Sequence, residues 1–163
     1  MPTLTETVIR AQLPYWQDAL RQALPRVAAR TVVLTGCGTS YYLAQSLACA
    51  FNAGGQRAIA VPGAEWARRP GVYLADPEGT TVIGLSRSGT TTETVQAITN
   101  SRARGWHTIA ISCEPGSTIL GAADEAICLP TDPREGIVMS VSASLMYLAG
   151  LRMAGLVLPE AIV

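Results

Sequence analysis

Short apolar runs alternate with longer amphipathic stretches along most of the chain. Five such runs are rich in Val, Ile, Leu and Ala and predict buried strands, and the intervening stretches carry apolar residues at helical spacing. The predicted strands are 31–35, 57–61, 81–85, 108–111 and 126–129. This alternation predicts an α/β fold, a five-stranded parallel sheet in the order 2-1-3-4-5 with helices on both faces.

Two stretches at the ends of the chain have their own patterns. Residues 3–25 carry a single apolar stripe at spacings of three and four, which predicts one docking helix within a helical lead-in over 1–30, ahead of an α/β core over 31–163. Residues 138–157 are apolar nearly all round and predict a helix buried on several sides. Its apolar positions exceed one helical face, so the sequence predicts that the chain associates with a partner or a second domain. The stripe consists of Ile9, Leu13, Trp16, Leu20 and Leu24.

The segments between the strands predict the remaining helices. Residues 41–51 and 91–104 read as helices, the second ending at Gly105, and a short helix follows the turn at 114–117. Residues 67–80 are predicted to be irregular.

Composition narrows the class of protein. The 163 residues suffice for one domain with a sizeable core, and 48% are hydrophobic and 15% charged. The formal net charge is zero, and all twelve basic residues are arginines. Without a basic run we expect no nucleic-acid partner. Without lysine, Schiff-base chemistry and a Walker-type phosphate loop are excluded for these residues.

The cysteines and the N-terminus give negative expectations. Cys37, Cys49, Cys113 and Cys128 form no C-x-x-C pair, so we expect free thiols, no metal and no other cofactor. The polar N-terminus does not resemble a signal peptide, so we expect a cytoplasmic protein. Arg152, Tyr147 and three serines argue against a membrane span at 138–157.

The most informative stretch is 82–95, which combines a buried strand, a hydroxyl-rich turn around Gly89 and a helix start. Thr90 and Glu93 have the spacing of a capping box for this helix. Free N–H groups and the helix dipole favour a bound anion at such a terminus, and phosphate is the natural ligand. The hydroxyl groups around the glycine are those of Ser86, Ser88, Thr90 and Thr91.

A second small-residue turn, 36–40, follows the first strand. Strands 1 and 3 are neighbours in the predicted order, and ligands bind such sheets beyond the carboxyl ends of the strands, where the order reverses. We therefore expect the two turns to face one crevice.

Two other interpretations of these turns are weaker. Gly36 and Gly38 could begin a dinucleotide fingerprint, but the third glycine is missing, as is an acid at the end of strand 2. The sequence around Ser86 is one residue away from a nucleophile elbow of a serine hydrolase. The only histidine, His107, precedes strand 4 and is predicted to lie at the opposite edge of the sheet, as a surface or strand-edge residue.

Three carboxylates lie near this crevice. Glu93 is explained by its capping role. Glu65 and Glu135 both follow strands on the ligand side, so each is either a catalytic base or an ordinary acid near a helix start.

The turns C-G-T-S at 37–40 and S-R-S-G-T-T at 86–91 together resemble the signature of the SIS (sugar isomerase) domain family, which has a flavodoxin-like fold. The likeness covers nearly the whole chain. It is strongest to the first SIS domain of the glucosamine-6-phosphate synthase isomerase part and to tagatose-6-phosphate ketose/aldose isomerases. The resemblance implies phosphate ligands at Ser40, Ser86, Ser88 and Thr91, with Gly89 and Thr90 in the same turn, Cys37, Gly38 and Thr39 lining the sugar, and Arg87 at a variable position.

The sequence departs from the family after Glu135. Synthase-like members have Lys or Arg within the run that aligns with 138–142, where this chain has Val141, and either Arg134 or Glu135 aligns with the family's glutamate. The histidine and lysine that complete catalysis in two-domain members have no counterpart here.

The resemblance implies a phosphosugar-binding domain with a hexose or amino-hexose 6-phosphate as ligand. One hypothesis is that residues 1–163 form one SIS domain of an aldose–ketose isomerase or deaminase. The chain is then either the N-terminal half of a two-domain protein or one subunit of a homodimer, and Glu65 or Glu135 is the base. The alternative is a non-catalytic module that senses a phosphosugar.

Overall fold

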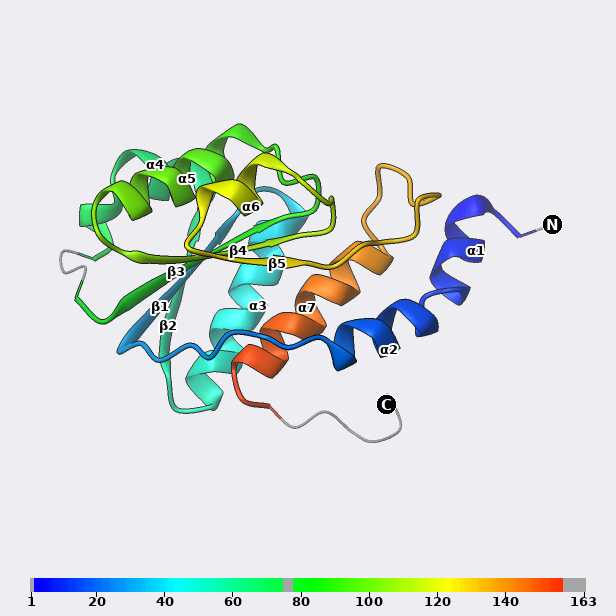
Figure 1. Ribbon diagram of the computed structural model, residues 1–163, viewed down its shortest axis with the longest axis horizontal. Coiled ribbons are helices and arrows are strands. Elements are labelled where there is room, and N and C mark those ends of the chain that lie inside the picture. The colour runs from blue at the N-terminus through cyan, green and yellow to red at the C-terminus, as the bar shows by residue number, and fades with distance from the viewer. Residues whose placement is uncertain (1, 75–77, 157–163) are drawn as a thin grey trace.

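The computed structural model describes residues 2–74 and 78–156, and its centre is a five-stranded parallel sheet (Figure 1). The strand order is β2-β1-β3-β4-β5, which confirms the predicted α/β architecture. The strands are β1 (Thr31–Gly36), β2 (Arg57–Pro62), β3 (Thr80–Ser86), β4 (His107–Ser112) and β5 (Glu125–Cys128). Each boundary lies within about one residue of the prediction, because the apolar β-branched runs end at small or turn-forming residues.

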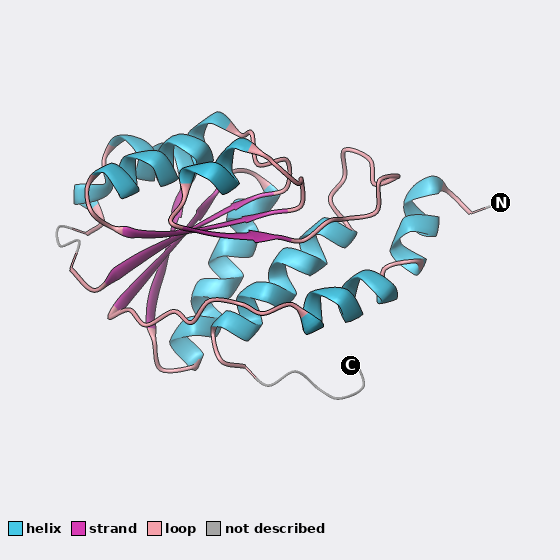
Figure 2. Cartoon of the chain, viewed as in Figure 1, coloured by secondary structure: helices cyan, strands magenta, loops and turns pink. Residues whose placement is uncertain are grey.

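Helices cover both faces of the sheet (Figures 1 and 2). One face carries α2 (Leu13–Arg21), α3 (Thr39–Ala53) and α7 (Val141–Met153), and the other carries α4 (Gly63–Arg68), α5 (Thr92–Ala103) and α6 (Thr118–Ala122). A short 3₁₀ helix, η1 (Pro70–Val72), follows α4, so part of the segment predicted to be irregular is helical. Residues 75–77 of that segment lie outside the described residues. Two hydrophobic cores result, one on each face of the sheet.

Close packing fixes the helices on each face. A Cβ atom at Gly150 of α7 would lie 2.4 Å from Cδ1 of Leu47 on α3, so glycine allows these two helices to pack closely. On the other face, Trp66 of α4 is buried, and its Nε1 donates a 2.8 Å hydrogen bond to Oγ of Ser101 on α5. The helices that flank the predicted crevice are therefore held rigidly.

The N-terminal segment differs from the prediction of one helix. It forms two helices, α1 (Leu4–Arg10) and α2, which are separated at Ala11 and Gln12. Pro14 lies in the first turn of α2, where its missing N–H costs nothing, but a continuous helix would need that N–H for a hydrogen bond. As a result Ile9 and Leu13 are 44% and 50% exposed instead of docked.

The final helix is shorter than predicted and is covered within the chain. Helix α7 begins at Val141, so residues 138–140 belong to the preceding loop, and residue 157 lies outside the described residues. Its apolar side chains pack in the core between the sheet, α2 and α3, and Trp16 of α2 donates a 2.7 Å hydrogen bond to Oγ of Ser144. The predicted surplus of exposed apolar positions on this helix is therefore wrong. Within 2–74 and 78–156, no helix is both long and apolar enough to cross a membrane.

Candidate functional site

The two turns identified from the sequence lie side by side at the carboxyl edge of the sheet. Strands β1 and β3 pair in parallel with Gly36 opposite Leu85, so the turns that follow them begin at the same level. The Thr94 hydroxyl of α5 donates a 3.5 Å hydrogen bond to Sγ of Cys37, which links one turn to the helix behind the other. Helices α3 and α5 begin here on opposite faces of the sheet (Figure 1). The turns and the two helix starts form the candidate crevice.

The turn 86–91 gathers its hydroxyl groups by internal hydrogen bonds. The buried Ser86 hydroxyl accepts from N of Gly89 at 3.1 Å and donates to Oγ1 of Thr91 at 3.3 Å. The exposed Ser88 hydroxyl accepts from N of Thr90 at 3.4 Å and from its Oγ1 at 3.2 Å. A bound anion can take over these donors without a change of backbone conformation.

The start of α5 is not the predicted capping box. The N-cap residue is Thr91, not Thr90, and no side chain accepts a hydrogen bond from the first helical turn. Glu93 is exposed and makes no capping contact there. The positive end of a 12-residue helix therefore faces the turn with its N–H groups uncapped, which is an arrangement suited to an anion.

The turn 37–40 supplies a second uncapped helix start. Gly38, with φ +55° and ψ −128°, is the N-cap residue of α3, and its carbonyl accepts from N of Tyr41 and N of Tyr42. This backbone conformation is readily adopted only by glycine. Ser40 is buried in the first turn of α3, whereas Gly38 and Thr39 are exposed and Cys37 is partly exposed.

A floor that the sequence reasoning did not assign supports the turn 86–91. Ser112 Oγ, at the end of β4, donates to the Arg87 carbonyl at 3.2 Å and accepts from Ser117 Oγ at 3.0 Å. The Arg87 carbonyl also accepts from N of Cys113, and the Gly89 carbonyl accepts from N of Ile119 at 2.9 Å. The serines at the ends of neighbouring elements were the available signal. The turn is therefore preorganised.

Glu65, the first carboxylate predicted as a base, lies on α4. Its Oε2 accepts from Arg69 Nε at 2.6 Å and from the Tyr73 hydroxyl at 3.3 Å. The hydrogen bond from Arg69 lowers the pKa of Glu65 below its ordinary value. Helix α4 touches the crevice at Gly63, where a Cβ atom would lie 2.9 Å from Cys37 Sγ.

Glu135, the second predicted base, joins the two ends of the loop between β5 and α7. Its Oε1 accepts from N of Ser140 at 2.6 Å, Oγ of Ser140 at 2.9 Å and N of Ser142 at 3.1 Å, and its Oε2 accepts from Oγ1 of Thr131 at 3.0 Å. Burial raises the pKa of Glu135, but the hydrogen bonds from Ser140 and Ser142 outweigh it, so the pKa lies below its ordinary value. In this structure Glu135 acts as the N-terminal cap of α7.

Arg87 and His107 complete the predicted set. Arg87 Nη1 donates to the carbonyls of Gly136 at 2.6 Å and Ile137 at 3.2 Å, so its side chain reaches from the turn to the β5–α7 loop. His107 is the exposed first residue of β4, with Nδ1 3.2 Å from Thr81 Oγ1 and Nε2 3.0 Å from Glu125 Oε1. This confirms its place at the opposite edge of the sheet, away from Ser86.

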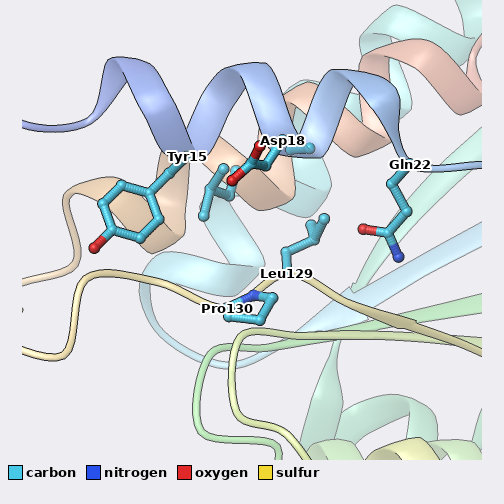
Figure 3. Close-up of a pocket in the computed structure, with 7 residues that line it drawn as sticks. Tyr15, Asp18, Gln22, Leu129 and Pro130 are labelled. Carbon is cyan, nitrogen blue, oxygen red and sulfur yellow. The ribbon is translucent and has the colours of Figure 1, made fainter.

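A pocket of about 330 Å³ lies elsewhere, between α2, α7 and the segment after β5 (Figure 3). Tyr15, Asp18 and Gln22 of α2 form its polar rim, and Leu129 and Leu145 belong to its apolar lining. Neither turn lines it. The anion-binding features of the crevice are thus separate from this more apolar hollow.

Comparison with curated proteins gives a relative that is much longer than this chain. Glutamine--fructose-6-phosphate aminotransferase [isomerizing] from Pyrobaculum aerophilum is 29% identical over 136 residues, which make up 79% of this chain and 22% of the relative. The chain thus spans less than a quarter of that protein.

Solved structures share the fold. The structure of c3406 from E. coli CFT073 aligns with a TM-score of 0.77 at 21% identity and covers 90% of this chain and 84% of its own. Tagatose-6-phosphate ketose/aldose isomerase from Escherichia coli aligns with a TM-score of 0.74 at 25% identity and covers 93% of this chain and 47% of its own.

A family model described as the SIS domain matches residues 27–156, which include the whole sheet, both turns and the helices that flank them. The match confirms the family suggested by the two turns. The chain belongs to the SIS domain family.

Proposed function

We propose that the crevice binds the phosphate group of a hexose or amino-hexose 6-phosphate. The observation that carries this proposal is the uncapped N-terminus of α5, which adjoins a turn rich in hydroxyl groups. Backbone N–H groups and the helix dipole stabilise a phosphate dianion there without lysine.

The proposal assigns roles residue by residue. The hydroxyls of Ser40, Ser86, Ser88 and Thr91 and the backbone at Gly89 and Thr90 contact the phosphate. Residues 37–39 line the sugar, because the exposed Gly38 and Thr39 border the turn on the side of α3.

The relatives support a six-carbon sugar phosphate. Two of the similar proteins carry fructose-6-phosphate or tagatose-6-phosphate in their names, and both are named as isomerising enzymes. The chain matches only part of each, so the activity of the whole proteins is a proposal for this one.

In the enzyme hypothesis the domain belongs to an aldose–ketose isomerase or a deaminase. A base then moves a proton between C1 and C2 of the open-chain sugar phosphate, and Glu65 or Glu135 is that base. Their lowered pKa values keep both ionised at neutral pH, which is the form that accepts a proton, but also weaken them as bases. We propose that a homodimer partner or a second SIS domain supplies the remaining groups, in the cytoplasm.

One observation favours the alternative, a phosphosugar sensor without turnover. Both carboxylates are already engaged, Glu65 with Arg69 and Tyr73 and Glu135 at the start of α7. A coupled assay over hexose and amino-hexose 6-phosphates separates the two hypotheses. Turnover that disappears in Glu65→Gln identifies an enzyme with this base, and binding without turnover identifies a sensor.

Replacing Ser88 with alanine tests the phosphate assignment. Ser88 is exposed at the mouth of the turn, so its loss leaves the fold intact while removing a donor to the ligand. We expect binding of fructose 6-phosphate or glucosamine 6-phosphate, measured by calorimetry, to weaken by about 1 to 3 kcal/mol, the range for a hydrogen bond to a charged group. The exposed Thr99 on the same helix provides a Thr99→Ala control that should bind normally. Equal affinity in the wild type and the Ser88 variant would remove the assignment.

A further inference from the structure

The loop between β5 and α7, residues 131–140, is held at its base and at its tip by different side chains. Glu135 closes the base, because its carboxylate binds Thr131 on one side and Ser140 on the other. The tip, residues 136–138, projects beyond this closure. Ile137 is 93% exposed and Val138 is 69% exposed, so hydrophobic burial does not hold the tip in place.

Arg87 makes the contact that fixes the tip. It lies in the turn 86–91, between two serines assigned to the phosphate, and its Nη1 donates to the carbonyls of Gly136 and Ile137 at 2.6 and 3.2 Å. Its own carbonyl is held by Ser112 and Cys113. A guanidinium with a fixed backbone and a fork of donors is suited to hold two successive carbonyls.

We propose that Arg87 is a positioning residue which fastens the loop tip to the phosphate turn, so that residues 136–138 form a wall of the sugar-phosphate site. The ligand in this inference rests on the proposed function, whereas the clamp itself does not.

The position of the contact explains its consequence. The tip lies within the reach of one arginine side chain from the turn, so it borders the part of a bound ligand that extends beyond the phosphate. Two exposed apolar side chains on that wall then decide which sugar fits. Since Gly136 follows Glu135 directly, the same contact also fixes the loop that carries this candidate base.

Replacing Arg87 with methionine tests the clamp without any ligand. Methionine retains an unbranched side chain but donates no hydrogen bond. Amide heteronuclear NOE values at Gly136 and Ile137 are expected to fall in Arg87→Met, whereas those of Ser142, held by Glu135, stay unchanged. Arg104→Met removes the same charge at the far end of α5 and should leave the tip unchanged. A tip that is equally rigid in all three proteins would overturn the clamp.

The ligand arm compares two probes, fructose 6-phosphate and inorganic phosphate, by calorimetry. Loss of a positive charge weakens both, because both carry a phosphate group, so the ratio of their affinities isolates the effect of the wall. We expect Arg87→Met to reduce this ratio at least fivefold and Arg104→Met to leave it unchanged. If both affinities fall by the same factor, Arg87 is a phosphate ligand and the positioning role is wrong. If neither probe binds the wild type, the proposed function fails while the NOE result still decides the clamp.

Discussion

Replacing Gly89 with alanine is expected to abolish phosphosugar binding and to lower the free energy of unfolding by about 2 to 4 kcal/mol. Gly89 has a φ of +62°, and a Cβ atom there would lie 2.0 Å from Oγ of Ser117 and 2.7 Å from Oγ of Ser112. The side chain would therefore push the turn off its floor and break the bond between the Gly89 carbonyl and N of Ile119. Urea unfolding measures the loss of stability, and calorimetry measures the loss of binding.

Gly105 provides the matched control for this substitution. It also has a left-handed φ, +83°, but a Cβ atom there meets nothing within 4 Å, and it follows the far end of α5. Gly105→Ala should therefore show only the backbone strain, about 1 kcal/mol or slightly more, and normal binding. If the two variants lose the same stability and both bind, close contact with the floor does not shape the turn.

Replacing Glu135 with alanine is expected to destabilise the fold by about 2 to 3 kcal/mol. The change removes the acceptor for N of Ser140 and N of Ser142 at the start of α7 and for the hydroxyl of Thr131. Ser140→Ala removes one hydroxyl donor and leaves both N–H bonds to the carboxylate, so it should cost about 1 kcal/mol. Equal urea midpoints for the wild type and Glu135→Ala would contradict the capping role.

The same carboxylate also makes stability depend on pH. Its pKa is lower in the folded chain than in the unfolded chain, so its contribution is fully present above the unfolded value of about 4.3 and is lost as the pH falls through the lower folded value. The stability advantage of the wild type over Glu135→Gln, measured by urea unfolding, should therefore shrink as the pH is lowered below about 4.3. An advantage that grows on acidification would show that the pKa is raised instead.

The sheet and the crevice could be predicted because both follow from local patterns. Apolar runs separated by helical stretches leave few ways to connect a parallel sheet, and the turns after strands 1 and 3 must then meet. The break at Gln12 was missed because the apolar stripe keeps its period across it. The capping box was wrong because the spacing of Thr90 and Glu93 fits the pattern one residue before the helix actually begins.

The roles of Glu135 and Arg87 depend on tertiary contacts and have no local signal. Glu135 caps a helix from a loop five to seven residues before the groups it binds, which is not the spacing of a capping box. Arg87 contacts carbonyls 49 and 50 residues away. Backbone carbonyls accept hydrogen bonds whatever the side chain, so the sequence of the loop does not reveal such a contact.

The most direct test of the account is an amide NMR titration of the wild-type chain with fructose 6-phosphate, inorganic phosphate and fructose. The account predicts that both phosphates shift the amide signals of Gly89 and of Thr92–Thr94 at the start of α5, and that fructose does not. Shifts confined to the pocket around Tyr15 and Leu145, or equal shifts with fructose, would contradict a phosphate site at this turn.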